Sequence, residues 1–154
     1  MSGFNVVLVE PEIPNNTGNI GRLCVATESV LHLIHPLGFQ IDESRVRRAG
    51  LDYWSDLAVH EYDCLEDCIG QVDTQASIHF FSSHGKRSLY STRISPGDWL
   101  IFGKESVGLS QEIRTRFEDR LTRIPFPGKV RSFNLANAVA MVLGEGMRQN
   151  SMDH

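Results

Sequence analysis

The sequence predicts an α/β fold in which helices cover both faces of a mainly parallel sheet. Short apolar runs rich in β-branched residues recur along the chain, as strands require. Helix-like stretches separate most of these runs, and strands joined by helices run parallel in one sheet. The chain also has 154 residues, which is enough for one domain with a core of its own but short for two.

Several apolar runs are expected to form strands of about 4 to 6 residues each. In chain order they are NVVLVE (Asn5–Glu10), LHLIH (Leu31–His35), SIHFF (Ser77–Phe81), WLIF (Trp99–Phe102) and LTRIPF (Leu121–Phe126). Their ends would lie at one edge of the sheet, because parallel strands all point the same way.

The helix-like stretches between these strands are GNIGRLCVATES (Gly18–Ser29), DCLEDCIGQV (Asp63–Val72) and SQEIRTRFED (Ser110–Asp119). The last of them opens on Ser110, whose hydroxyl suits a helix cap, and has the acidic Glu112 near its start. A further helix is expected after Asn134, where residues 135–143 are apolar nearly all round. Such a helix is buried on most faces, either in the core or against another subunit.

The composition is that of an ordinary globular protein, with 41% hydrophobic and 22% charged residues. No apolar run approaches the roughly 20 residues that a membrane span needs, and the start of the chain lacks the pattern of a signal peptide. We therefore expect a cytoplasmic protein. Residues 1–154 are expected to form a single domain, with a loose tail from about residue 149, where QNSMDH begins.

The three cysteines cannot all pair within the chain. Cys64 and Cys68 are one helical turn apart, which is not a zinc-site spacing, so buried reduced thiols are expected rather than metal binding. The net charge of -4 argues against a general nucleic-acid coat protein, whose affinity comes from summed contacts of Lys and Arg with phosphate. A local basic face remains open, because RVRRAG, HGKR and GKVR concentrate positive charge in loops.

Unusual loops follow the predicted strands, at the edge where α/β proteins bind ligands. They are PEIPNNTGNIGR, SSHGKR, GKESVGL and PGKVRSFN. None contains the GxGxxG fingerprint or the Walker loop, which disfavours a nicotinamide enzyme or an NTPase. No GxSxG elbow is present, and His32 and His79 lie within apolar strands as structural histidines would, so a hydrolase is also disfavoured.

Each polar loop has a purely structural interpretation beside a functional one. Asparagine and threonine in PNNTGNIGR can cap a helix, but a cation such as Arg22 near a helix N-terminus opposes the macrodipole and so indicates a ligand or a partner chain. Glu105 can be a solvated charge in a glycine-bounded turn, or it can face a ligand. Ser132 and Asn134 can cap the last helix, or their loop can cradle a ligand.

Taken together, three stretches resemble the motifs of the SPOUT superfamily of RNA methyltransferases. NNTGNIGR is similar to motif 1, LIFGKESVGL to motif 2 and IPFPGKVRSFNLANAVAMVLGE to motif 3, in this order along the chain. The opening VLVEPEIPNNTGNIGRLC and the later RRAGLDYW resemble the TrmL type, which methylates the 2'-hydroxyl of the wobble ribose in tRNA. The resemblance covers essentially the whole chain.

The resemblance implies a fold that periodicity does not predict, in which the C-terminal segment threads through a loop as a deep trefoil knot. It implies S-adenosylmethionine as cofactor, held in that knot and released as S-adenosylhomocysteine, and an obligate homodimer with the helix after motif 3 at the interface. One departure is Gly144-Glu145-Gly146, where an aromatic residue commonly precedes the glutamate. Two glycines disfavour a helix interior by about 1 kcal/mol each, so this helix end is a weak point of the resemblance.

Functional residues carry over from the motifs position by position. The implied catalytic residues are Asn16, Arg22, Glu105 and Asn134, and the residues implied to bind the cofactor are Phe81, Gly103, Ile124 and Ser132. The family's arrangement makes Arg22 the activator of the ribose hydroxyl. A guanidinium stays protonated at neutral pH, so Arg22 can instead stabilise the developing alkoxide or hold the adjacent phosphate, and no metal is required.

The chain has no room for an appended RNA-binding domain, so the dimer itself is expected to bind tRNA at the anticodon loop. The candidates for phosphate contacts are Arg45, Arg47, Arg48, Lys86, Arg87, Lys129 and Arg131, although each can equally be a solvated surface charge. Two alternatives stay open: a superfamily member acting on another tRNA or rRNA ribose, and a small α/β module that binds a nucleotide without chemistry.

Overall fold

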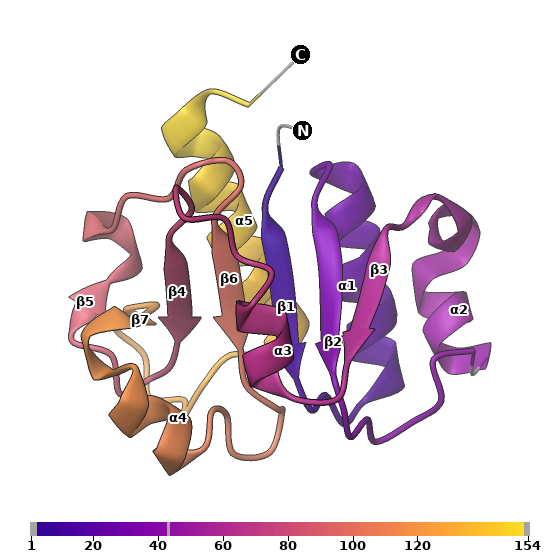
Figure 1. Cartoon of the computed structure of the whole chain (residues 1–154), viewed down its shortest axis with the longest axis horizontal. Helices are drawn as coiled ribbons and strands as arrows, with labels where there is room; N and C mark the ends of the chain where they lie inside the picture. The colour runs from indigo at the N-terminus through magenta and orange to yellow at the C-terminus, as the bar shows by residue number, and fades with distance from the viewer. Residues whose placement is uncertain (1–2, 43, 153–154) are drawn as a thin grey trace.

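The protein is an α/β domain whose sheet is parallel throughout, as the sequence predicts (Figure 1). The computed structural model describes residues 3–42 and 44–152, and of residues 47 and 50–52 the backbone alone. The sheet contains, in spatial order, β3 (Val59–Tyr62), β2 (Val30–Ile34), β1 (Asn5–Val9), β6 (Trp99–Phe102), β4 (Ile78–Phe81), β7 (Leu121–Arg123) and β5 (Arg87–Ser88).

Helices cover both faces of the sheet. One face carries α1 (Pro14–Ala26) and α5 (Leu135–Asn150), with α2 (Ser44–Gly50) packed outside α1. The other face carries α3 (Leu65–Ile69) and α4 (Gln111–Arg116). The structure also contains short 3-10 helices, which are η1 (Leu51–Asp56), η2 (Leu89–Ser91) and η3 (Glu118–Arg120).

The hydrophobic core has two layers because side chains along a strand alternate between the two faces of the sheet. In β1, Val6 and Leu8 pack with α1 and α5, whereas Val7 and Val9 pack on the side of α3 and α4. All five residues of β1 are buried, which explains why this strand is a continuous apolar run in the sequence.

The five predicted strands all form, with small differences in their bounds. The largest difference is at LTRIPF, whose strand stops at Arg123 because Pro125 and Pro127 have no N–H with which to continue the ladder. The edge strand β3, the two-residue β5 and the helix α2 were not predicted. Helix α1 begins at Pro14 rather than at Gly18, with the proline in the first turn, where its missing N–H has no consequence.

Helix α5 continues through the two glycines that were expected to weaken it and ends at Asn150. A methyl group on Gly146 would lie 2.7 Å from Cζ of the buried Phe4 ring, so the glycine lets the helix approach the core. Residues 149 and 150, where a loose tail was expected to begin, lie in α5. Side-chain amides of Gln149 and Asn150 donate to the Thr92 and Ile94 carbonyls at 2.8 Å each.

The histidines and cysteines singled out in the sequence lie in structural positions. His32 is buried, and its two ring nitrogens contact the Tyr62 hydroxyl and Asn5 Oδ1 at 2.9 Å each. His79 contacts Asp98 through Nε2 at 3.0 Å. All three cysteines are free, with Cys24 and Cys68 buried and Cys64 half-buried. In the part of the chain that the structure describes, no helix has both the length and the apolar character to cross a membrane.

Candidate active site

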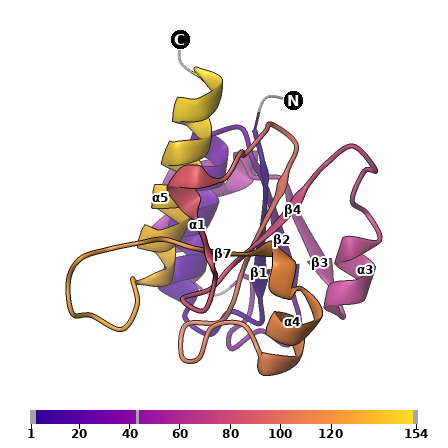
Figure 2. The ribbon, with the colours of Figure 1, turned by 90° about the vertical axis from the view of Figure 1, so that its left-hand side faces the viewer.

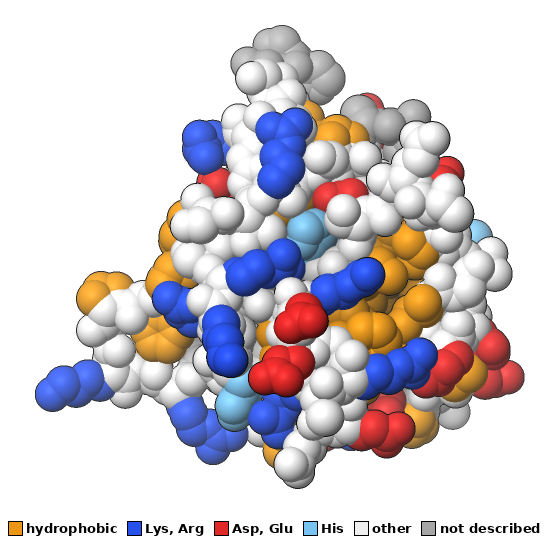
Figure 3. Space-filling view, turned by 60° about the vertical axis from the view of Figure 1, so that its left-hand side comes forward, with side chains coloured by type: hydrophobic (Ala, Val, Ile, Leu, Met, Phe, Trp, Pro, Cys, Tyr) orange, Lys and Arg blue, Asp and Glu red, His pale blue; other side chains and the backbone are white. Residues whose placement is uncertain are grey.

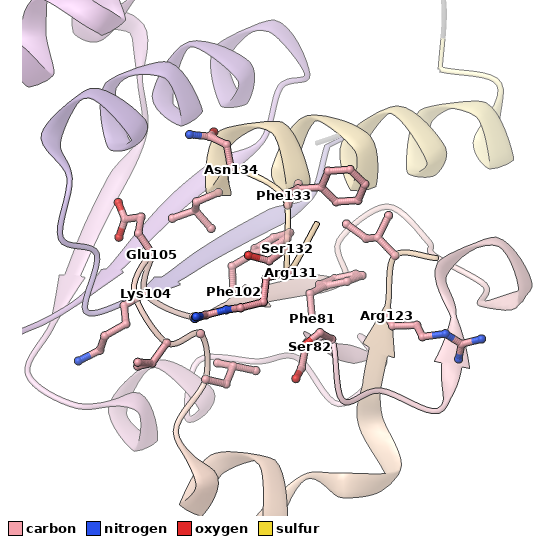
Figure 4. A pocket seen from close by; sticks show the side chains of 18 of the residues that line it. Phe81, Ser82, Phe102, Lys104, Glu105, Arg123, Arg131, Ser132, Phe133 and Asn134 are labelled. Carbon is pink, nitrogen blue, oxygen red and sulfur yellow. The ribbon is translucent and has the colours of Figure 1, made fainter. Parts of the chain in front are cut away.

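A pocket of about 880 Å³ opens where β6, β4 and β7 end, beside the first turn of α5. After β7 the chain swings out in a wide loop and returns to α5 on the other face of the sheet (Figure 2). The rings of Phe81 and Phe102, from neighbouring strand ends, stack at the pocket with centroids 4.9 Å apart (Figure 4). The pocket thus combines apolar surface from the strand ends with polar loops around its mouth.

The loop after β6 lies against itself and forms one wall of the pocket. A methyl group on Gly103 would lie 2.1 Å from the backbone carbon of Gly108, so only glycine permits this approach. Gly108 also has φ of 70°, a left-handed conformation that glycine adopts without strain. The two glycines of GKESVGL therefore fix the shape of the wall, as the structural interpretation of this turn required.

Glu105 holds the start of α1 from the opposite loop. Its carboxylate accepts from the backbone N–H of Glu12 at 2.8 Å, from that of Ile13 at 2.9 Å, and from Asn16 Nδ2 at 3.2 Å. Ile13 is the cap position of α1 and has no side-chain cap of its own, so Glu105 supplies the negative charge that a helix N-terminus favours. Glu105 is therefore held in one orientation at the pocket wall.

Asn16 and Asn134 extend this hydrogen-bonded chain to the last helix. Asn134 Nδ2 donates to Asn16 Oδ1 at 3.2 Å, and Asn134 Oδ1 accepts from the backbone N–H of Asn137 at 3.2 Å as the cap of α5. Asn134 therefore caps the helix, which was the structural one of the two interpretations left open for this residue. The structure thus brings together three of the four predicted catalytic residues, Glu105, Asn16 and Asn134, and all three line the pocket.

Arg22, the fourth predicted catalytic residue, is not among the residues that line the pocket. It is exposed on α1, and its guanidinium carbon lies 5.0 Å from the ring centroid of Tyr53 in η1. Such a contact is a cation–π interaction, which restrains the guanidinium without neutralising it. Within one chain, therefore, the proposed activator lies away from the pocket.

The four residues predicted to hold the cofactor all line the pocket: Phe81, Gly103, Ile124 and Ser132. They come from the ends of β4 and β6 and from the two ends of the loop between β7 and α5. Other lining residues were not singled out from the sequence, among them Phe126 and Phe133, whose rings meet edge to face with centroids 4.8 Å apart. The sequence feature that could have indicated these two lining residues is the presence of two phenylalanines in a proline-rich loop.

Arg123 also lines the pocket and was not predicted. Its guanidinium is turned away from the pocket centre (Figure 4) and donates through Nη1 to the Lys86 carbonyl at 2.6 Å. A second, longer bond of the same atom reaches the Gly85 carbonyl at 3.4 Å. Arg123 therefore holds the SSHGKR loop in place beside the pocket.

The candidate basic residues form two groups at opposite ends of the sheet. Arg45, Arg47 and Arg48 belong to α2, outside α1, although the side chain of Arg47 lies outside the described residues. The other four lie after β4 (Lys86 and Arg87) and in the loop before α5 (Lys129 and Arg131), and of these Arg131 lines the pocket. In Figure 3, lysine and arginine side chains border an apolar patch together with Asp and Glu side chains. In the part of the chain that the structure describes, the two groups are therefore separate.

Several of these basic side chains already have partners. Arg87 Nη2 donates to Thr122 Oγ1 at 3.1 Å, and Lys86 Nζ lies 3.9 Å from Glu118 Oε1. Arg131 Nη2 donates to the Ser106 carbonyl at 3.3 Å, which joins the loop before α5 to the loop after β6. Arg131 therefore shapes the mouth of the pocket in addition to any contact with RNA.

The described residues contain no group of three or more His, Cys, Asp or Glu side chains that could hold a metal ion. The site instead offers an apolar pocket, backbone groups at glycine-rich strand ends and a fixed chain of one carboxylate and two amides. Such a pocket suits an uncharged heterocyclic ring with polar groups at its edge.

Comparisons with known proteins agree with this picture. The model of the SpoU rRNA methylase family matches residues 3–144. The chain is 44% identical over 150 residues to the tRNA (cytidine(34)-2'-O)-methyltransferase of Acidovorax sp. strain JS42, covering 96% of this chain and 93% of that one.

Solved structures extend the comparison to the fold. One that concerns the 2-OH methylation of C/U34 on tRNA has 41% sequence identity and a TM-score of 0.93, covering 99% of both chains. The SpoU methyltransferase AviRb from Streptomyces viridochromogenes, in complex with AdoMet, has a TM-score of 0.87 at 23% identity and covers 100% of this chain and 60% of that one. At that identity the likeness shows the fold alone.

Proposed function

The chain belongs to the SpoU rRNA methylase family, and on that premise we propose that it methylates the 2'-hydroxyl of the wobble ribose, nucleotide 34, of tRNA. The relatives with this activity match nearly the whole chain, and no large segment of theirs lacks a counterpart here. The observation that carries the proposal is the chain Glu105–Asn16–Asn134 at the wall of an apolar pocket. The substrate is tRNA, and the second product is S-adenosylhomocysteine.

The pocket fits S-adenosylmethionine by size and by chemistry. Its volume of about 880 Å³ lies within the usual range for cofactor sites, roughly 300–1,000 Å³. Phe81 and Ile124 offer apolar surface for an adenine ring, and the backbones at Gly103 and Ser132 offer hydrogen bonds at its edge. When bound, the cofactor supplies an electrophilic methyl group on its sulfonium sulfur.

The residues of the chain supply geometry to the reaction. The ribose hydroxyl gives its proton to solvent water as its oxygen takes the methyl group, so negative charge develops on that oxygen in the transition state. Asn134, fixed by Asn16 at the pocket wall, is the residue that orients the ribose. Arg22 is the cation that stabilises the developing charge or holds the neighbouring phosphate.

The exposed position of Arg22 supports a homodimer as the active form. Arg22 does not line the pocket of its own chain, so the substrate must bridge from the pocket to α1 or meet Arg22 of a second copy. We propose that two copies associate through α5, whose exposed and half-buried positions include Asn137, Ala140 and Gly144. The family's trefoil knot is part of the same proposal, supported by β7 lying between β4 and β5 while α5 lies on the far face.

Mixing two inactive variants tests this arrangement. If each site draws Arg22 from one copy and Asn134 from the other, co-expression of Arg22→Ala with Asn134→Ala restores part of the wild-type activity. If both residues of a site come from the same copy, every site in a mixed dimer lacks one of them. Mixing the two variants then restores no activity. If the protein is a monomer at the concentration used in the assay, the proposed dimer is wrong.

Transfer RNA is the substrate, and the basic residues near the pocket are its proposed contacts. Lys129 is exposed in the loop before α5, and Lys86 is exposed after β4. In a dimer, the arginines of α2 from one copy can complement these lysines from the other. The anticodon loop suits such a surface, because its unpaired bases can be turned toward a pocket. We expect the protein to act in the cytoplasm, where tRNA is modified.

The direct test is incubation of labelled S-adenosylmethionine with unmodified tRNA, followed by mapping of the labelled nucleotide. Label on the 2'-oxygen of nucleotide 34 is the expected result. Label on another tRNA or rRNA ribose would overturn the wobble assignment and keep the family chemistry. Cofactor binding without transfer to any RNA would favour a nucleotide-binding module instead.

A further inference from the structure

The loop after β6 is tied to the segment between β1 and α1 by bonds that run in both directions. Glu105 accepts from the backbone N–H groups of Glu12 and Ile13, as described above. In return, the Glu12 carboxylate accepts from the backbone N–H of Ser106 through Oε1 at 2.8 Å. Lys104 Nζ adds an ion pair with Glu10 Oε1 at 3.2 Å. None of the proposed catalytic steps uses Glu12.

The backbone at Glu12 is itself held by neighbouring residues. Gly38, in the loop after β2, donates its backbone N–H to the Pro11 carbonyl at 2.9 Å. A methyl group on Gly38 would lie 2.8 Å from Cα of Glu12, so the two backbones are in close contact. The Glu12 carboxylate therefore projects toward Ser106 from a backbone that contacts the loop after β2.

Ser106 is held from both sides. Its N–H donates to Glu12, and its carbonyl accepts from Arg131 Nη2 at 3.3 Å. Both Ser106 and Arg131 line the pocket, whereas Glu12 does not. Through the two successive peptide groups that carry its N–H and its carbonyl, Ser106 thus connects the start of α1 with the loop that precedes α5, across the mouth of the pocket.

The Ser106 N–H also lowers the pKa of the Glu12 carboxyl below its usual value, because the N–H bonds better to the charged carboxylate than to the neutral acid. A charged acceptor makes the stronger kind of hydrogen bond. Without the hydrogen bond between Ser106 and Glu12, the loop between Gly103 and Gly108 would lose the contact that sets the direction of the Ser106 carbonyl. Arg131 would then lose its acceptor at the pocket mouth.

We infer that Glu12 is a positioning residue: by holding Ser106 it presents the Ser106 carbonyl to Arg131 and so closes the loop before α5 over the cofactor. The inference rests on the proposed function, because it takes the pocket to be the cofactor site. A purely structural role would make Glu12 contribute to folding stability and leave cofactor affinity unchanged. The two roles differ in what a conservative substitution restores.

Three variants separate these roles. Glu12→Ala removes the acceptor, and Glu12→Gln retains a side-chain oxygen that can accept from the Ser106 N–H. Glu112→Ala, at an exposed position in the first turn of α4, removes a comparable charge away from the pocket. Calorimetric binding of S-adenosylhomocysteine and thermal unfolding are measured for each protein.

The expected result is that Glu12→Ala raises the Kd for S-adenosylhomocysteine about fivefold to tenfold, the effect of losing one exposed hydrogen bond. Glu12→Gln should recover most of that affinity, and Glu112→Ala should bind as the wild type does. Amide hydrogen exchange at Ser106 should become faster in Glu12→Ala without ligand. Adding Arg131→Ala to Glu12→Ala should cost less than the two single effects combined, because both act through Ser106.

The outcomes distinguish the two proposals. Wild-type affinity in Glu12→Ala, with the wild-type chain binding normally, overturns this inference and leaves the proposed function standing. A lower melting temperature in Glu12→Ala with unchanged Kd also overturns it, in favour of a structural role. Failure of the wild-type chain to bind S-adenosylhomocysteine overturns the proposed function and this inference together.

Discussion

Asn134 donates its side-chain amide to Oδ1 of Asn16 at 3.2 Å, which ties the first turn of α5 to the first turn of α1 across 118 positions of sequence. The orientation of both amides follows from their other partners. Asn16 must direct its nitrogen at Glu105, because a carboxylate can only accept, and its oxygen then faces Asn134. Asn134 must donate to that oxygen, which leaves its own oxygen to cap α5.

Asn134→Asp separates the two roles of this residue. An aspartate still caps α5, but it presents an acceptor to the Asn16 oxygen, so the bond between the helices becomes a repulsion. We expect a melting temperature near that of the wild type and a fall in kcat/KM of about 100-fold, measured with unmodified tRNA. Asn134→Ala, by contrast, loses the cap and about 1 kcal/mol of stability. Wild-type turnover in Asn134→Asp would remove the residue from the catalytic role.

Tyr53 restrains Arg22, and its removal should affect turnover alone. The ring lies under the guanidinium at 5.0 Å, and an exposed cation–π contact contributes about 0.5–1 kcal/mol. We expect kcat for Tyr53→Ala to fall about twofold to fivefold, with the Kd for S-adenosylhomocysteine unchanged, and Tyr53→Phe to keep wild-type kcat. Arg22→Ala should lose turnover altogether and still bind the cofactor product. A change of Kd in Tyr53→Ala would show that the ring acts on the pocket instead.

The sequence predicted the parts of the fold that local pattern determines. β1 and β6 are buried on both faces, so their residues are apolar without interruption and stand out as strands. Ser110 was predicted as a cap, and capping was one of the two interpretations of Asn134, because a cap depends on neighbouring backbone N–H groups alone. The edge strand β3 was not predicted, because its middle residues are exposed and so give little apolar signal in the sequence.

The contacts within the site could not be read from pattern in the same way. Motif resemblance indicated Glu105, but its partners at Glu12 and Ile13 are more than 90 positions away and become visible only when both loops meet at one sheet edge. Gly146 shows that helix propensity alone does not predict where a helix can form. Glycine disfavours a helix interior, yet α5 needs it because of Phe4, a residue from the far end of the chain.

The two glycines of α5 predict opposite effects of one substitution. At Gly144 an added methyl group meets no atom within 4 Å, whereas at Gly146 it meets the buried Phe4 ring at 2.7 Å. Within a single chain, Gly144→Ala should therefore leave stability unchanged or raise it by up to about 1 kcal/mol, and a larger loss would come from the subunit interface proposed at this residue. Gly146→Ala should lower it by about 1–3 kcal/mol through overpacking. Urea unfolding of both variants provides the measurement, and equal effects would contradict the packing account.

Stability should fall as the pH drops from 6.5 toward 4, because of His32. Burial, together with the charge of the neighbouring His60, lowers the pKa of His32 to about 4. In this range the unfolded chain binds a proton at His32 that the folded chain excludes, so acid favours unfolding, by about 2 kcal/mol between pH 7.5 and pH 5. Urea unfolding at both pH values measures the difference. His32→Gln should flatten it, whereas His60→Gln, at the exposed paired position in β3, should leave most of it in place. Equal slopes in wild type and His32→Gln would assign the acid sensitivity to another group.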